Sequence, residues 1–215
     1  MSATVTPLSN VRDLGIFLDS QLSISDQVTS LCRAGYYQLR QLRTITQSLT
    51  PDAATTLVHS FISGRLDYCN SLLYGIADHH MKRLQSVQNA AARLVTCTRR
   101  SEHITLVLQS LHWLPVHQRV AYKMAMLVHK CLNGRAPAYL ADDLCWAGRR
   151  RPGSRSADRC VLDVPRVCSS FGDRTFAVAG PRVWNDLPQS LRDPSLSESV
   201  FGKRLKTYLM GLGAH

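Results

Sequence analysis

Apolar residues recur at intervals of three and four along most of the chain, which is the spacing of one face of an α-helix. Residues 11–19 instead alternate in the manner of a strand, and a second short strand is predicted at 161–165. The pattern therefore predicts a mainly α protein: a helical bundle with one N-terminal strand and a small C-terminal α/β segment. The predicted helices cover residues 24–45, residue 51 onward with a further turn over 66–74, 79–98, 104–111, 116–132, 139–144, 171–184 and 198–210.

Residues that favour helix ends lie at several of these boundaries. Thr50-Pro51 combines an N-cap threonine with a proline at the first helical position. Ser25 and Asp78 are predicted to cap the helices that begin beside them. Asn133-Gly134 is predicted to end the helix over 116–132, because glycine readily adopts the left-handed conformation that closes a helix.

Basic residues exceed acidic ones, and the excess lies in the middle of the chain. Lys and Arg number 26 against 15 Asp and Glu, which gives a net charge of +11. Residues 79–135 contain nine basic residues and a single acidic one, Glu102, whereas residues 1–78 contain five and six. A polyanion such as RNA or DNA is the predicted partner, and a merely solvated basic face is the alternative.

Helical geometry would gather these cations on two faces. One line of side chains runs along the helix predicted at 79–98 and on to residue 100, and a second lies on the outer side of the helix at 116–132. Residues 148–159 add an Arg-rich segment that is predicted to be a linker. Such groups can bind a phosphate backbone without reading its sequence. The predicted binding residues are Lys82, Arg83, Asn89, Arg93, Arg99 and Arg100 on the first face, Arg119, Lys123 and Lys130 on the second, and Arg149, Arg150 and Arg151 in the linker.

Other classes of protein are not favoured by the sequence. No stretch approaches the roughly 18 consecutive apolar residues of a membrane-spanning helix, and the polar start lacks a secretory core. An intracellular protein without a membrane partner is therefore expected. The seven cysteines include no C-x-x-C pair, and Cys32, Cys69 and Cys131 are predicted to be core residues because their neighbours are apolar. No metal site and no cofactor are predicted, although His112 and His117 lie close together.

No active-site motif is present either. Phosphate-binding glycine loops, Gly-x-Ser-x-Gly elbows and His-Glu-x-x-His pairs are all missing from the sequence. Asp142 and Asp143 resemble the carboxylate pair that binds metal ions in polymerases. They fall in a predicted helical segment rather than in a turn between paired strands, so we interpret them as surface acids. No catalytic residue is predicted.

A series of short motifs runs along the chain. They read RLDYCN at 65–70, LQSVQNAAAR at 84–93, SLHWLPV at 110–116, GDRTF at 172–176, PRVWNDLP at 181–188 and KRLKTYL at 203–209. In order and spacing the series resembles the portion after the catalytic palm in reverse transcriptases of LINE-type non-LTR retrotransposons, within their jockey-like branch. The resemblance extends over residues 11–210.

The resemblance implies a division of the chain. Residues 1–22 would be a remnant of the last palm strand, 23–147 a helical domain like a polymerase thumb, 148–159 the linker and 160–215 a C-terminal helical segment. The family's catalytic carboxylates lie upstream of the matched portion. The expected function is therefore that of a catalytically incomplete fragment of an RNA-directed DNA polymerase that retains sequence-independent binding to RNA or DNA.

Two alternatives stay open. The chain is an inert structural product of a decayed, upstream-truncated element, or it is part of an active reverse transcriptase whose upstream sequence is missing. Among the motif residues, Gln88, Asn89 and Arg93 are the polar positions to test first. The motif tryptophans Trp113 and Trp184 could stack on bases, but the Leu and Pro that follow each of them favour packing.

Overall fold

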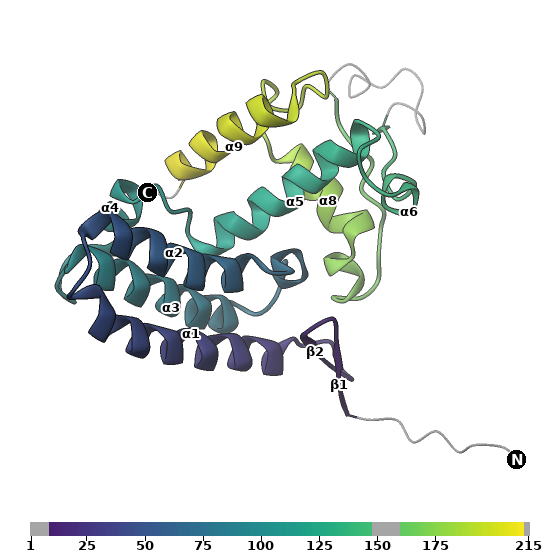
Figure 1. Ribbon diagram of the computed structural model, residues 1–215. Coiled ribbons are helices and arrows are strands. Elements are labelled where there is room, and N and C mark those ends of the chain that lie inside the picture. The colour runs from purple at the N-terminus through teal and green to yellow at the C-terminus, as the bar shows by residue number, and fades with distance from the viewer. Residues whose placement is uncertain (1–8, 148–159, 213–215) are drawn as a thin grey trace, which may run out of the picture. The chain divides into compact units, whose positions relative to one another are not determined.

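The computed structural model describes residues 9–147 and 160–212 (Figure 1). Helices dominate this part of the chain, so the prediction of a mainly α protein is confirmed. None of the described helices is long and apolar enough to cross a membrane. In chain order the elements are β1 (Asn10–Asp13), β2 (Ile16–Asp19), α1 (Ser25–Thr46), α2 (Pro51–Asp67), η1 (Asn70–Leu73), α3 (Asp78–Thr96), α4 (Ile104–Ser110), α5 (Val116–Leu132), α6 (Ala138–Ala141), η3 (Gly172–Arg174), α8 (Phe176–Asn185) and α9 (Glu198–Leu212).

The chain divides into two compact units. The first unit comprises the residues up to 68 together with 76–107, and the second comprises 69–75 together with the residues from 108 onward. This division differs from the one predicted, in which residues 23–147 formed one helical domain. The reason is that α5 packs against α8 and α9, which follow the predicted linker in sequence.

The first unit is built on three helices, α1, α2 and α3, which pack against one another in pairs and lie side by side in Figure 1. Their apolar stripes meet in a core that includes Val28, Val58, Ile62, Leu84 and Ala91, all almost fully buried. This is the arrangement that the period of three and four predicts. Each helix buries one apolar face against the other two, because that removes the face from water.

The N-terminal segment is a hairpin, so the prediction of one strand over 11–19 is wrong in its topology. β1 and β2 pair antiparallel, with Asp13 opposite Ile16, and the two-residue loop Leu14-Gly15 joins them. Both loop residues have positive φ, 45° and 83°, as the tightest hairpin turns require. Side-chain bonds attach the hairpin to the rest of the unit. The Phe17 amide donates to Gln27 Oε1 of α1 at 3.0 Å, Asn10 Nδ2 donates to Asp26 Oδ2 of α1, and Tyr68 Oη donates to the Leu14 carbonyl at 2.6 Å.

The predicted helix caps are confirmed at some ends and wrong at others. Thr50 accepts a bond from the Ala53 amide and Pro51 is the first residue of α2, as predicted. Ser25 does not cap α1; the Asp19 carboxylate instead accepts bonds from the amides of Ser23 and Ile24. Burial raises the pKa of Asp19, but the hydrogen bonds from Ser23, Gln21 and Ile24 together outweigh it, so the pKa is lowered. Asp78 lies in the first turn of α3 and makes no cap bond.

The second unit packs α8 and α9 against α5. Its core gathers Met124 and Val128 from α5, Trp184 from α8, and Phe201 and Leu205 from α9. His129 is buried within this core, stacked on the Phe201 ring with 4.3 Å between ring centroids. Its Nε2–H donates to the Leu196 carbonyl at 3.0 Å, because a carbonyl oxygen can only accept. Asn133 ends α5, and Gly134 follows it with a φ of 64°, as the sequence predicted.

The strand predicted at 161–165 does not form. Leu162 makes a single bridge with Trp146, and the described residues from 160 onward contain no strand, so the predicted α/β segment is helical. Side chains of α8 form hydrogen bonds with the backbone groups of this extended segment, in place of a neighbouring strand. Asn185 exchanges two bonds with the backbone of Leu162, at 2.9 and 2.8 Å, and Trp184 Nε1 donates to the Cys160 carbonyl at 2.9 Å.

Three predicted helix boundaries also change. The helix expected at 171–184 begins as the short turn η3, and α8 starts only at Phe176. The turn of helix expected at 139–144 is shorter and covers Ala138–Ala141. The helix expected at 79–98 ends at Thr96, because Cys97 adopts a left-handed conformation with a φ of 52°. The last of these changes alters the predicted binding face.

Candidate nucleic-acid interface

The first predicted face lies at α3 and the turn after it, in the first unit. Lys82 and Arg83 are exposed on α3, and Arg93 is half-buried in its last turn. Because α3 ends at Thr96, Arg99 and Arg100 do not continue the helical line that was predicted; they lie exposed in the following turn. The cations therefore occupy a helix and its C-terminal turn rather than one straight stripe.

Some of these polar residues already have partners within the first unit. Arg83 Nη2 donates to Thr29 Oγ1 at 3.1 Å. Asn89 Oδ1 accepts a bond of 2.8 Å from Gln85, and Gln88, which accepts from the same amide group, is buried. Gln88 is thus a core residue. Among the described residues, the side chains of Lys82 and Arg100 form no ion pair, so they are the least committed members of the face.

The second predicted face belongs to α5 and therefore to the second unit. Lys130 forms an ion pair with Glu198 at 3.1 Å, and Arg119 Nε donates to the Leu114 carbonyl at 2.8 Å. Lys123 is exposed. Two of the three cations thus serve the structure of their own unit. Arg149, Arg150 and Arg151, predicted to bind in the linker, lie outside the described residues.

The other candidate groups behave as packing or surface residues. Trp113 and Trp184 are buried, which excludes stacking on bases and agrees with the predicted packing role. Cys32 and Cys131 are core residues as predicted, whereas Cys69 is only half-buried, and burial raises the pKa of the Cys32 and Cys131 thiols. Asp142 and Asp143 are exposed at the end of α6, as expected of surface acids.

No metal-ligating cluster of three or more His, Cys, Asp or Glu side chains occurs within the described ranges. The chain contains seven cysteines and eight histidines, but the part of it that the structure describes does not gather them with acids at one place. All seven cysteines lie in the described residues, and none of them forms a disulfide.

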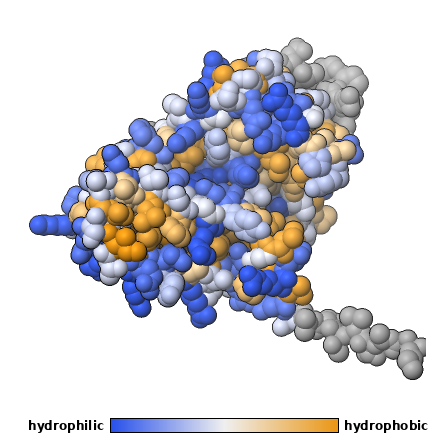
Figure 2. Space-filling model, viewed as in Figure 1, coloured by the Kyte–Doolittle hydropathy of each residue, from blue (hydrophilic) through white to orange (hydrophobic). Residues whose placement is uncertain are grey.

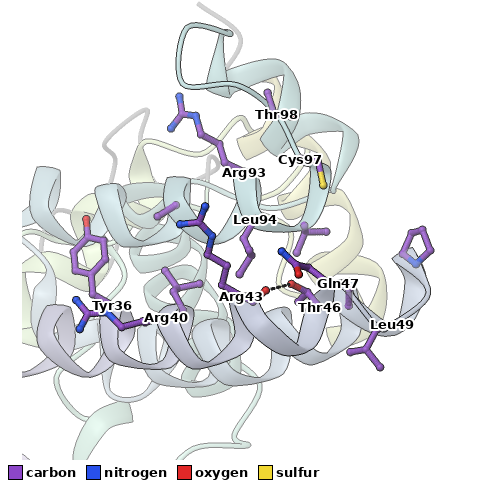
Figure 3. A pocket seen from close by; sticks show the side chains of 15 residues that line it. Tyr36, Arg40, Arg43, Thr46, Gln47, Leu49, Arg93, Leu94, Cys97 and Thr98 are labelled. Atoms are coloured by element: carbon purple, nitrogen blue, oxygen red, sulfur yellow. Dashed lines mark hydrogen bonds between the residues drawn. The ribbon is translucent and has the colours of Figure 1, made fainter.

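The structure adds a group of residues that the sequence analysis missed. A cavity of about 880 Å³ opens in the first unit between the C-terminal half of α1, the start of α2 and the end of α3 (Figure 3). Arg40 and Arg43 of α1 line it together with Arg93 of α3. Tyr36, Arg40, Arg43 and Gln47 recur at intervals of four and three, which places them on one face of α1. This helical spacing is the feature of the sequence that could have predicted a polar and basic face on α1.

The lining of this cavity combines apolar and cationic surface. Its apolar part includes Leu39, Ala54, Ala90, Leu94 and Val95, and no lining residue is acidic. Elsewhere on the first unit, Figure 2 shows a further patch of hydrophobic residues at the left of its view. Three guanidinium groups without a lining carboxylate favour an anion, since like charges at short range otherwise destabilise one another.

Arg93 belongs both to the predicted binding face on α3 and to the lining of the cavity. Its Nη2 donates to the Glu102 carbonyl at 3.5 Å, the limit of hydrogen-bond distance, and its Nε is buried without a partner in the described structure. A buried donor without an acceptor costs about 1–3 kcal/mol. Figure 3 shows Arg43 reaching from α1 toward α3, on the side from which Tyr36 also projects.

Comparison with protein-family models, with characterised proteins and with solved structures found no match to this chain.

Proposed function

We propose that this chain is a non-catalytic helical part of a non-LTR retrotransposon reverse transcriptase, and that it binds the backbone of RNA or DNA without sequence preference. The motif series from RLDYCN to KRLKTYL supports the family. The observation that carries the binding is the charge of the first unit: residues 79–101 contain five cations and no acid, and they form α3 and its C-terminal turn.

Cations of this kind suit backbone binding for a physical reason. Each Lys or Arg that contacts a phosphate releases condensed counterions, so affinity depends on salt and not on base sequence. Lys82 and Arg100 are exposed and Arg99 lies beside Arg100, so none of the three has to leave a buried position to reach a phosphate.

The proposal is tested by fluorescence anisotropy of a labelled DNA duplex, titrated at several salt concentrations. The variant replaces Lys82, Arg99 and Arg100 with Ala. We expect log affinity to fall linearly with log salt, and the slope to decrease by about 0.9 for each phosphate contact that the variant loses.

A charge-matched control comes from α9. Lys203, Arg204 and Lys206 are all exposed there, and their replacement with Ala removes the same three charges from the second unit. The control is expected to keep the wild-type slope. Equal slopes for both triple variants would contradict the assignment to α3, and no binding at all would favour the inert product of a decayed element.

The non-catalytic part of the proposal has its own test. A primer-extension assay with Mg²⁺, a primed RNA template and nucleoside triphosphates is expected to show no incorporation by this chain. Incorporation above a heat-inactivated sample would instead favour the active polymerase.

A further inference from the structure

The cavity between α1, α2 and α3 has a chemistry that backbone binding alone does not use. A phosphate backbone needs cations, but most of the residues that enclose these 880 Å³ are apolar or uncharged. We propose, resting on the function above, that this cavity seats one unstacked base of a single-stranded nucleic acid while its flanking phosphates lie against Arg40, Arg43 and Arg93.

The size of the cavity fits a ligand of this kind. Volumes of about 300–1,000 Å³ are typical of sites that enclose one small molecule, and a nucleotide is of that scale. The lining includes Ala54 and Ala90, whose side chains are single methyl groups. Such small side chains leave room in the cavity for a flat ring. A partner helix would need a longer apolar groove for anchors at successive turns.

The distribution of charge and aromatic surface supports the same occupant. A nucleotide joins an apolar ring to an anionic phosphate, and the cavity joins apolar residues to three arginines. Tyr36 is about half exposed beside them, with 47% of its surface accessible, so a base can stack on its ring. Neither Arg40 nor Arg43 has an ion-pair partner among the described side chains, so both can bind a phosphate.

A strand fits better than an isolated nucleotide, because the cations continue beyond the cavity. Thr98 belongs to the lining, and Arg99 and Arg100 follow it directly in the turn after α3. A chain whose base occupies the cavity would therefore find further cations for its neighbouring phosphates. A duplex keeps its bases stacked and paired, so only a single strand supplies a base without the cost of opening the helix.

The reactivity of Cys97 reports directly on occupation of the cavity, because this residue lines the cavity and is exposed. The experiment measures the rate of Cys97 alkylation by iodoacetamide with peptide mass spectrometry, on the full chain. Cys168 is also exposed but belongs to the second unit, so it serves as the internal control. The ligands are a short oligodeoxythymidylate, an abasic deoxyribose-phosphate strand of the same length, thymidine monophosphate and a short poly-glutamate.

We expect the oligodeoxythymidylate to slow alkylation of Cys97 and not of Cys168. Its affinity, measured by anisotropy, should exceed that of the abasic strand by about tenfold, as expected for one stacked base. Equal affinity and equal protection by the abasic strand would overturn the base site while leaving backbone binding intact. Binding without protection of Cys97 would do the same, whereas absence of any binding would overturn the proposed function itself.

Two further outcomes overturn the identity of the occupant. Protection by thymidine monophosphate at the same concentration as the strand would make the cavity a nucleotide site, and stronger protection by poly-glutamate would make it a site for an acidic peptide. Either result rejects the single strand.

Substitutions at Ala90, Ala53 and Arg43 distinguish an effect on the cavity from an effect on folding. Ala90→Leu fills the cavity from α3, and Ala53→Leu makes the same change at an exposed position of α2 outside the lining. We expect Ala90→Leu to lose the preference for the oligodeoxythymidylate over the abasic strand and Ala53→Leu to keep it. Arg43→Gln leaves the cavity open and is expected to weaken both strands, with an unchanged thermal midpoint as the check on folding. A retained preference in Ala90→Leu would contradict the proposal.

Discussion

Individual motif residues hold the local structure together. Trp184 and Asn185 of the PRVWNDLP motif bond to the backbone at Cys160 and Leu162, and Arg182 of the same motif pairs with Asp173 of the GDRTF motif at 2.7 Å. Each of these side chains forms a hydrogen bond or an ion pair with a residue in another segment of the second unit. The motif residues described in this way stabilise the fold, and the cations that could meet a ligand lie mostly outside the motifs.

His129 makes the stability of the second unit depend on pH. Burial in the core lowers the pKa of His129, while the bond to the Leu196 carbonyl and the charge of Glu198 act in the opposite direction. The unfolded chain, with a histidine pKa of about 6.5, therefore binds a proton more readily than the folded one. The contribution of His129 to the free energy of unfolding is then fully present above a pH of about 6.5 and is lost as the pH falls below that value.

We expect urea denaturation of the wild type to show this loss of stability between neutral pH and pH about 5, at about 1.4 kcal/mol for each pH unit in which only the unfolded chain is protonated. His129→Gln cannot titrate and should show a weaker pH dependence. His80, whose pKa is also lowered by burial, retains its own contribution in both proteins. His103→Gln, at an exposed position, is the control and should follow the wild type. Parallel curves for His129→Gln and the wild type would contradict the assignment.

Close packing of α1 on α3 sets the shape of the first unit at the scale of elements. Gly35 lies at their contact, where a methyl group would approach Val87 Cγ1 to 2.6 Å. A helical glycine normally costs about 1 kcal/mol relative to alanine. Here the absence of a side chain lets the two helices approach, so a residue unfavourable for the helix is favourable for the packing.

Two glycine substitutions test this interpretation as a matched pair. Gly35→Ala is expected to destabilise the protein by about 1–3 kcal/mol, because the added carbon overpacks the α1–α3 contact. Gly64→Ala in α2, where a methyl group meets nothing within 4 Å, is expected to stabilise it by about 0.5–1 kcal/mol. Chemical denaturation measures both. Stabilisation by Gly35→Ala would show that the helices can move apart at little cost.

Helix positions were largely predictable from the sequence, but several ends were not. The stripes that predicted α1, α2, α3, α5 and α9 bury most of their apolar residues, because periodicity reflects the face that leaves water. Ile45, Phe61 and Val200 belong to these stripes but are exposed. The hairpin needs positive φ at both Leu14 and Gly15, and the end of α3 needs it at Cys97. Gly15 is a signal for such a turn, but leucine and cysteine rarely adopt this conformation, so Leu14 and Cys97 give no signal in their own residue type.

At the scale of the whole molecule, each of the two units has its own core. All three tryptophans, Trp113, Trp146 and Trp184, belong to the second unit. Tryptophan fluorescence therefore reports on the second unit alone, whereas far-UV circular dichroism reports on the helices of both.

The variant Ile62→Ala tests whether the two units unfold separately, because the two spectroscopic signals report on different units. Ile62 is buried in the core of the first unit, so its truncation is expected to cost that unit about 2–5 kcal/mol. In a denaturant titration we expect the circular dichroism transition to acquire an earlier phase while the fluorescence midpoint stays in place. Coincident transitions that shift together would mean that the two units unfold as one cooperative system.

The candidate binding surface was only partly predictable. The sequence identified an excess of cations in residues 79–135, and the structure divides them between α3 with its turn and α5. Arg40 and Arg43 were missed because residues 1–78 carry as much acidic as basic charge and show no local excess. They join Arg93 only because α1 and α3 pack side by side.

The sequence by itself determined the helical class, most helix positions, the excess of positive charge and the burial of both motif tryptophans. These properties are local: each follows from the spacing or the composition of neighbouring residues. The tertiary structure alone decided that α5 joins α8 and α9, that the Asp19 carboxylate binds the amides of Ser23 and Ile24 just before α1, and that Tyr36, Arg40, Arg43 and Arg93 surround one cavity. Those outcomes depend on which apolar faces pack together, and packing joins residues that lie far apart in the chain.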